Sequence, residues 1–328
     1  MLHNSGNLTG LVVKEKSMKE GSALAAIDIG SNSILLETAR VERGQIRMQM
    51  HRKETVRLGG ALNAQGELDD GAMQRGWECL ERFAQLIPHI PPSQRRVAAT
   101  QTLREAVNRE VFLSRASEIL QCPVELISGE EESRLIYQGV SLFLPDDLQY
   151  RLVVDIGGRS SELAWGQGPH LIQASSYPLG SVGWAQRFFG DGDLSAEAFA
   201  RAHAAAMALL APAQDMARKY ADHPQAQVYG ASGTAGAISK VLGVQGHAPG
   251  SISRDALFAL RDLLQTKGHV KHLGSIQGLR PELVTVIGGG ISVMCAMFDC
   301  LQLQQMRMAQ GALRHGLLAS LQDNAIKI

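Results

Sequence analysis

The sequence lacks the features that mark membrane, secreted and nucleic-acid-binding proteins. No apolar run approaches the ~20 residues that a membrane-spanning helix needs, and the N-terminal residues 1–22 hold no long apolar core of the signal-peptide kind. The 32 basic and 32 acidic residues cancel, so no overall field attracts nucleic acid or an anionic membrane. We therefore expect a cytoplasmic protein that binds neither nucleic acid nor a membrane.

Cysteine is also scarce. The four cysteines, at positions 79, 122, 295 and 300, form neither a CxxC pair nor a zinc-ligand spacing. This spacing fits reduced structural thiols better than a disulfide framework. With 328 residues, 45% of them hydrophobic, the chain is long enough for two domains with cores of their own.

The spacing of apolar residues predicts two similar series of elements after a flexible tail at residues 1–22. The first series contains strands 23–29, 34–42 and 45–58, helix 69–87, strand 95–100, helix 103–120, strand 124–128 and helix 130–139. The second contains strands 151–156, 161–167 and 170–179, helices 182–189 and 195–220, and strand 227–232. Both begin with three strands in a row, which indicates two α/β domains of one kind.

The openings of the two series are alike in sequence. LAAIDIGSNS at residues 24–33 and LVVDIGGRSS at residues 152–161 share an apolar run, an aspartate, a glycine and a serine in register. An apolar run ending in Asp-x-Gly is common, so chance is the alternative, but the matching order of elements favours an internal repeat. Two like domains facing each other form a cleft into which the ends of their first strands open.

Both openings offer the groups that a bound phosphate needs. A glycine turn supplies N–H donors, neighbouring hydroxyls add hydrogen bonds, and carboxylates hold a divalent cation. Asp28 and Asp155 end their strands where a metal-bound water would bridge to phosphate. For each serine the alternative role is turn capping. The candidate phosphate-binding residues of the two turns are Gly30, Ser31, Ser33, Gly157, Gly158, Ser160 and Ser161.

Two further strand-to-helix segments resemble each other. ATQTLREA, residues 99–106, can cap a helix that carries Arg104 one turn in and aims its guanidinium into the cleft. A helix cap with a surface arginine is the alternative. GASGTAGAI, residues 230–238, presents Ser232, Gly233 and Thr234 in the same way.

Two more stretches have a functional and a structural interpretation. Three glutamates, Glu130 to Glu132, open a helix; the helix dipole explains at least two of them, while one could act as a general base worth 10²–10⁴-fold. VTVIGGGISVM, residues 284–294, is predicted as a strand, a glycine turn and a helix. Such a turn either touches a nucleoside or allows close packing of helix on strand.

Seven motifs in this order resemble the exopolyphosphatase and guanosine pentaphosphate phosphohydrolase family of the actin-like ATPase superfamily. They are AIDIGSNS, ATQTLREA, ELISGEEESRLIYQGV, LVVDIGGRSSEL, YGASGT, VIGGGISV and QGALRHG, spread over roughly residues 23–320. The resemblance implies an α/β fold of two ribonuclease-H-like domains with an interdomain cleft. We assign them to residues 23–138 and 139–305, with a C-terminal helix at 306–321 as a candidate addition to the first.

The resemblance also implies an activity, which is Mg²⁺-dependent release of the terminal phosphate from inorganic polyphosphate or guanosine pentaphosphate, with Mn²⁺ as the alternative ion. Glu132 falls on the family's general base, Arg104 on its phosphate-binding arginine, and Asp155 and Glu162 on carboxylates that act on metal and water. We add Asp28 to the metal ligands. Loop donors are expected at Ser31, Asn32 and Gly233. The family further implies a homodimer.

The chain departs from the family at one position of the second phosphate turn. Where the family has Asp-Ile-Gly-Gly-Gly-Ser-Thr-Glu, the third glycine is replaced by Arg159. If this position requires a left-handed backbone, the arginine costs roughly 1–2 kcal/mol. Its guanidinium would either clasp a phosphate or fill the space meant for one. Two alternatives to a hydrolase therefore stay open: a non-catalytic sensor of polyphosphate or an alarmone, and a sugar or acetate kinase that uses the glycines at 288–290.

Overall fold

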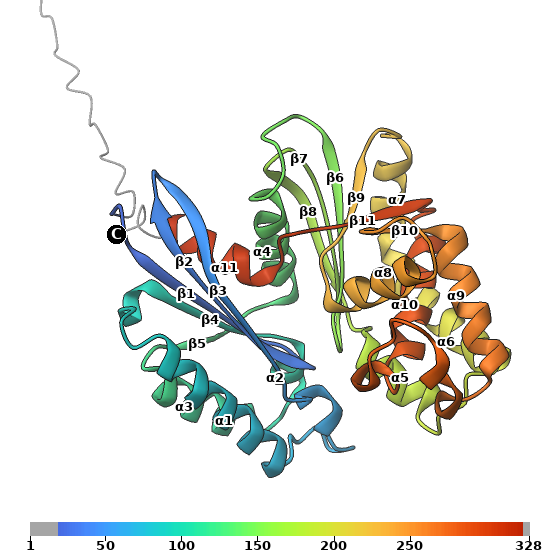
Figure 1. The fold of residues 1–328 in the computed structure, drawn as a ribbon, viewed down its shortest axis with the longest axis horizontal. Coiled ribbons are helices and arrows are strands. Elements are labelled where there is room, and N and C mark those ends of the chain that lie inside the picture. Colours follow the sequence, from blue (N-terminus) through green and yellow to red (C-terminus); the bar gives the residue numbers. More distant parts are fainter. Residues whose placement is uncertain (1–18, 324–328) are drawn as a thin grey trace, which may run out of the picture.

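The structure, a computed structural model, describes residues 19–323, so the predicted tail at residues 1–22 lies almost wholly outside the described part. Two mixed β-sheets stand side by side, with helices on their outer faces and between them (Figure 1). We call the part around the first sheet the first lobe and the part around the second sheet the second lobe. None of the described helices is both long enough and apolar enough to span a membrane.

The first sheet has the strand order β3-β2-β1-β4-β5. Its strands are β1 (Ala23–Ile29), β2 (Ser33–Glu42), β3 (Gln45–Thr55), β4 (Arg95–Ala99) and β5 (Val124–Leu126). The first three strands are antiparallel, whereas β4 and β5 run parallel to β1. Helices α1 (Asp70–Leu86) and α3 (Arg109–Leu120) cover the outer face with apolar side chains that form one core with this sheet (Figure 1).

The second sheet repeats this arrangement. Its order is β10-β11-β9-β6-β7-β8, so that β6 is central and antiparallel to β7 while β9 runs parallel to it, as β4 does to β1. The strands are β6 (Tyr150–Ile156), β7 (Ser161–Gln167), β8 (His170–Tyr177), β9 (Gln227–Gly230), β10 (Ser251–Ser253) and β11 (Gln305–Met308). The repeat seen in the sequence is thus confirmed in the topology.

Six helices cover the outer face of the second sheet and enclose the largest core of the molecule (Figure 1). They are α5 (Ser181–Phe189), α6 (Ala196–Leu209), α7 (Gln214–Ala221), α8 (Gly233–Val244), α9 (Arg254–Lys267) and α10 (Ile287–Cys300). Because α8 follows β9 directly, its N-terminus is held at the end of the sheet that faces the first lobe.

A layer of two helices lies between the sheets. Helix α11 (Leu313–Asp323) packs on β1 and β4, and α4 (Gly129–Ser141) packs on β7 and β8. The two helices cross at glycines, because a side chain on Gly316 would overlap the Leu135 carbonyl oxygen. The predicted C-terminal helix therefore contacts the first sheet, but it begins only at Leu313, since residues 305–308 form β11. Our domain boundary at 138/139 falls inside α4 and remains an interpretation.

Two predicted helices are interrupted. The helix predicted over 103–120 is two helices, α2 (Gln101–Glu105) and α3, because the Asn108 side chain accepts from the Leu68 N–H (2.9 Å) and donates to its carbonyl (3.0 Å). These bonds turn the chain between the helices. The helix predicted over 195–220 ends with α6 and resumes as α7 around Pro212, which lacks the N–H that a continuous helix would use.

The glycine turn predicted at 288–290 is wrong, because these residues lie within α10 and no strand precedes them. An added Cβ on Gly289 would stand 2.5 Å from the Ala185 backbone nitrogen, and one on Gly288 would stand 2.9 Å from the Leu194 side chain. The glycines therefore let α10 approach α5 closely. The glycines do allow close packing, as the alternative interpretation proposed, but α10 packs on a helix and not on a strand.

Candidate active site

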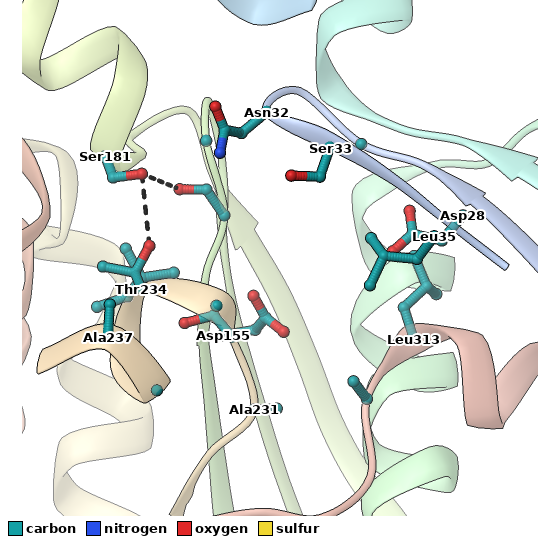
Figure 2. A pocket seen from close by; sticks show the side chains of 18 of the residues that line it. Asp28, Asn32, Ser33, Leu35, Asp155, Ser181, Ala231, Thr234, Ala237 and Leu313 are labelled. Carbon is teal, nitrogen blue, oxygen red and sulfur yellow. Dashed lines mark hydrogen bonds between the residues drawn. The ribbon is translucent and has the colours of Figure 1, made fainter. Parts of the chain in front are cut away.

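A cavity of about 530 Å³ opens between the two lobes. Its walls come from the turns after β1 and β6, the N-terminus of α8, the start of α10 and the segment that joins β11 to α11. Figure 2 shows Asp28 and Asp155 on opposite walls, with Asn32 and Ser33 on the turn after β1. The cavity thus combines the two sequence motifs that resemble each other.

The two turns are built alike and touch each other. The Gly30 N–H donates to the Ser33 carbonyl (3.1 Å), and the Gly157 N–H donates to the Ser160 carbonyl (2.9 Å). These two N–H groups are therefore used inside their turns, which leaves other N–H groups of the turns and the Ser33 hydroxyl for a ligand. A side chain at Gly158 would stand 2.7 Å from Ser31 Cβ, so the glycine there permits the contact between the lobes.

Four acidic side chains line the cavity, and the three other than Glu282 lie at the ends of strands or helices. Asp28 ends β1, Asp155 ends β6, and Glu132 lies in the first turn of α4. Burial, followed by the charge of Glu132, raises the pKa of Asp28 and of Asp155 to about 7. Such groups are expected where a cation or a proton is to be bound.

Glu162 lies behind the cavity wall. It is directly opposite Asp155 on the antiparallel neighbour β7, so the two carboxylates share one face of the sheet. It is 2% exposed, and Ser176 Oγ donates to it across 2.9 Å. Burial, followed by the charges of Glu132 and Asp155, raises its pKa well above the usual range. In the first lobe Leu35 takes the equivalent place opposite Asp28, so only the second lobe supplies a carboxylate pair.

Glu132 is held by a cap and an arginine. Ser128 accepts from the Glu131 N–H and so caps α4, and Arg104 Nη1 donates to Glu132 Oε2 across 2.9 Å. Burial raises the pKa of Glu132, and the Arg104 charge opposes that shift. Arg104 itself does not line the cavity. Its Nη2 is buried without a hydrogen-bond partner among residues 19–323, an arrangement that is rare away from functional sites.

The predicted hydroxyl groups divide into two sets. Ser33 Oγ lines the cavity and, within the described part of the chain, is buried without a partner. Thr234 Oγ1 donates to Ser181 Oγ across 3.4 Å at the cavity wall (Figure 2). By contrast, Ser161 Oγ donates to the Leu179 carbonyl (2.7 Å) outside the cavity, and Ser232 caps α8 by accepting from the N–H of Ala235. The capping alternative holds for Ser232.

Arg159 points away from the cavity. Its guanidinium forms an ion pair with Glu105, with Nη2 and Oε2 2.6 Å apart, and Nη1 donates to the Gly59 carbonyl across 2.9 Å. Its φ is not positive, so the condition for the cost of a left-handed backbone is not met. The arginine neither lines the cavity nor fills it, and we correct its predicted role as a phosphate ligand accordingly.

The structure brings most of the predicted residues to one place. Those that line the cavity are Asp28, Gly30, Ser31, Asn32, Ser33, Glu132, Asp155, Gly157, Gly158, Ser160, Ser232, Gly233 and Thr234. Arg104, Arg159, Ser161 and Glu162 lie outside the lining.

Sequence reasoning missed four nitrogen-bearing side chains of the cavity, which are the imidazole of His51 and the cations Lys53, Arg280 and Arg314. Arg314 donates to Glu37 (2.8 Å) and Arg280 forms an ion pair with Glu282 (3.2 Å), whereas no hydrogen bond or salt bridge joins the Lys53 ammonium to another residue of the described chain. Burial, Arg280 and Arg314 lower the pKa of Lys53. An added Cβ on Gly233 would stand 3.6 Å from Lys53 Nζ, so this ammonium reaches across the cleft to the N-terminus of α8.

The carboxylates suit a divalent cation bound in part by a ligand. Across residues 19–323 no three His, Cys, Asp or Glu side chains converge closely enough to hold an ion by themselves. Mg²⁺ is usually bound by one or two carboxylates together with phosphate oxygens and water, and Asp28 and Asp155 offer such oxygens to the cavity. The donor set therefore fits Mg²⁺.

Comparison with known proteins identifies relatives of the whole chain. The family model of the Ppx/GppA phosphatase family matches residues 38–325. A solved exopolyphosphatase-like protein is 25% identical over 92% of this chain and 98% of its own, with a TM-score of 0.79. The Aquifex aeolicus PPX-GPPA enzyme is 24% identical over 91% and 99%, with a TM-score of 0.74. An exopolyphosphatase from Cytophaga hutchinsonii is 20% identical over 92% and 98%, with a TM-score of 0.79. The predicted family is confirmed, and so is the predicted α/β fold with two lobes and a cleft between them.

Proposed function

The chain belongs to the Ppx/GppA phosphatase family, and on that premise we propose that it hydrolyses the terminal phosphoanhydride bond of inorganic polyphosphate or guanosine pentaphosphate. The observation that carries the proposal is the position of Glu132, which is buried, paired with Arg104 and faces the same cavity as Asp28 and Asp155. This arrangement combines a base, a charge-neutralising arginine and oxygen ligands.

Glu132 acts as the general base. It takes a proton from a water molecule while the water oxygen attacks the terminal phosphorus, and the bridging P–O bond breaks on the opposite side. The electron pair of that bond leaves with the shortened chain, and inorganic phosphate is released. Arg104 favours the ionised form of the Glu132 carboxylate, because its charge opposes the rise in pKa that burial causes.

Asp28 and Asp155 would hold a Mg²⁺ ion, and Glu162 would act through its neighbour Asp155. When bound, the ion would offset the negative charge of the phosphate groups. The turns that contain Gly30 to Ser33 and Gly157 to Ser160 surround the terminal phosphate with hydroxyls and N–H groups.

The cations on the far side of the cavity receive the leaving chain. No carboxylate oxygen of the described chain lies within 4 Å of the Lys53 ammonium. This ammonium stands beside the N-terminus of α8, which adds the positive end of a helix dipole. A phosphate bound there would interact with both lobes. This gives the cavity a place for a second phosphate beyond the one that is cleaved.

Phosphate release from short polyphosphate, long polyphosphate and guanosine pentaphosphate, measured in parallel with Mg²⁺, tests the proposal. Glu132→Gln should lose most of the activity while its thermal unfolding stays unchanged. Glu131→Gln is the matched control, because Glu131 lies in the same turn of α4 but pairs with Arg134 and does not line the cavity. Absence of release from every substrate by folded protein, or full activity of Glu132→Gln, would contradict the proposal.

Neither alternative function gains support from the geometry. The sensor hypothesis rested on Arg159 closing the phosphate site, yet this side chain points away from the cavity. The kinase hypothesis rested on a glycine turn that is part of α10. The preferred substrate, the preferred metal and the homodimer stay predictions.

A further inference from the structure

Arg159 begins a chain of hydrogen bonds that runs from the second lobe into the first. Its Nε and Nη2 both reach Glu105 Oε2, at 2.7 Å and 2.6 Å. The other carboxylate oxygen, Oε1, accepts from Gln101 Nε2 across 2.8 Å. Glu105 is thus held from both sides, once by each lobe.

The same chain continues to the candidate base. Gln101 Oε1 accepts from Arg104 Nε across 2.9 Å, and Arg104 Nη1 donates to Glu132 Oε2 across 2.9 Å. Five side chains therefore connect the turn after β6 with the carboxylate in the first turn of α4. Every link joins a donor to an acceptor, and each of the four involves a charged group, which makes such bonds stronger than neutral ones.

Each link also fixes the orientation of the next. The Gln101 amide must present its NH₂ to Glu105 and its oxygen to Arg104, so it has only one productive orientation. Helix α2, which carries Gln101, Arg104 and Glu105, has five residues and is too short to hold its side chains by itself. Arg159, at the far end, therefore restrains the Glu105 carboxylate from the second lobe.

Arg159 is itself firmly held. Its Nη1 donates to the Gly59 carbonyl, and its backbone packs on Gly180, where an added Cβ would stand 2.5 Å from the Arg159 nitrogen. A second bond between the lobes, from Gln186 Nε2 to the Gly60 carbonyl (3.1 Å), lies nearby, but Gln186 meets the chain only at Arg159 Nη1, at 3.5 Å. Two contacts therefore join the lobes here: the one made by Arg159 is linked to Glu132 through hydrogen bonds, and the one from Gln186 to Gly60 is not.

We propose that Arg159 is a positioning residue for the reaction: through Glu105, Gln101 and Arg104 it holds the Glu132 carboxylate in place for attack. The inference rests on the proposed function, because it concerns how the base of that reaction is oriented. Arg159 touches neither substrate nor metal, since it lies outside the cavity lining.

Steady-state kinetics on the full chain separate this role from a purely structural one. Arg159→Met should lower kcat for polyphosphate by about 10- to 100-fold, because small displacements of a catalytic group cost rates of that order, while KM changes by less than about twofold. Arg159→Lys, which keeps one charged bond to Glu105, should recover part of the loss. Gln186→Leu is the matched control and should keep kcat.

Further variants test the chain link by link. Glu105→Gln should lower kcat in the same way, and the double variant Arg159→Met/Glu105→Gln should lose no more than Arg159→Met alone, because both act on one path. Independent, additive losses would overturn the proposal. So would equal losses in Arg159→Met and Gln186→Leu, which would mean that the arginine only ties the lobes together.

A measurement that does not depend on turnover distinguishes failure of this inference from failure of the proposed function. NMR measurement of hydrogen exchange at Arg104 Nε should show exchange at least about tenfold faster in Arg159→Met than in the wild type or Gln186→Leu, since exchange requires the hydrogen bond to open. Unchanged exchange would overturn this inference even if the enzyme is active. Absence of phosphate release from the wild type would instead contradict the proposed function.

Discussion

Arg104 Nη1 lies 2.9 Å from Glu132 Oε2, in a region where both side chains are largely withdrawn from water. The pair has two opposing effects on the pKa of Glu132, which burial raises and the guanidinium lowers. Because burial is the larger effect, Glu132 is poised to gain or lose a proton nearer to neutral pH than an ordinary glutamate does.

Activity should therefore rise with pH. A general base works only when it is deprotonated, so kcat/KM should increase through the pKa of Glu132, and the acidic limb should lie above the ~4.3 of a free glutamate. Arg104→Met removes the opposing charge and should move this limb to still higher pH, whereas Arg115→Met, at an exposed site, should not. A pH profile between 5 and 9 measures both; a limb that stays in place in Arg104→Met would contradict the assignment.

Removal of the Lys53 charge should weaken substrate binding more than catalysis. Lys53 faces the cavity beside the N-terminus of α8, where we place the leaving chain, so Lys53→Met removes an interaction present in both the ground state and the transition state. KM for polyphosphate should rise about tenfold, the loss of roughly 1.4 kcal/mol, and kcat should change little. Arg47→Met, at an exposed position of the same strand, serves as the control. A fall in kcat with constant KM would place Lys53 at the reacting phosphate instead.

The metal-free protein should lose stability as the pH rises. Asp28 and Asp155 have a pKa of about 7 in the folded protein and about 3.9 when unfolded, so the folded state binds more protons between these values. The free energy of unfolding should fall from about pH 4 to pH 7 and then level off. Urea unfolding with a chelator at pH 5.5 and pH 8 measures this difference.

Replacing one of these carboxylates by a neutral amide should remove part of this loss of stability at high pH. Asp155→Asn should be more stable than the wild type at pH 8 without metal, by on the order of 1–3 kcal/mol. Added Mg²⁺ should stabilise the wild type more than the variant, since the ion binds the folded state through Asp155. Asp222→Asn, at an exposed loop position, should change neither quantity. Equal stabilisation of all three proteins by Mg²⁺ would contradict the metal assignment.

Two glycine-to-alanine substitutions should act in opposite directions. Gly316→Ala forces α11 away from α4, because its methyl group would overlap the Leu135 carbonyl, and should destabilise the protein by about 1–3 kcal/mol or more. Gly243→Ala, in α8 with open space around it, should stabilise the protein by roughly 0.5–1 kcal/mol. Thermal unfolding of both variants tests this, and a stabilising Gly316→Ala would contradict the close crossing of the two helices.

The sequence predicts the parts of the site that are local in the chain. Asp28 and Asp155 each end an apolar run before a glycine turn, and this local pattern was enough to place them at strand ends facing a cleft. The capping role of Ser232 is likewise a matter of neighbours in sequence. Such predictions hold because backbone geometry over a few residues decides them.

The remaining features depend on partners distant in sequence. Lys53 lies on a strand whose charged residues look like a solvated face, and only the approach of α8 puts it in the cavity. Arg159 was expected in the phosphate site because its neighbours are there; its actual partners, Gly59 and Glu105, belong to the other lobe. The glycines of α10 likewise owe their role to α5, which no local pattern indicates.

The position of α11 has a consequence for how the protein is made. Residues up to Leu126 complete the five strands of the first sheet, but one apolar face of that sheet, including Leu24 and Ala26, is covered by Leu317 and Leu318 of α11. At about 5–20 residues per second, the ribosome needs roughly 10–40 s to synthesise the chain from Leu126 to Leu317. During this time the nascent sheet exposes an apolar face, which is a binding surface for chaperones and a starting point for aggregation.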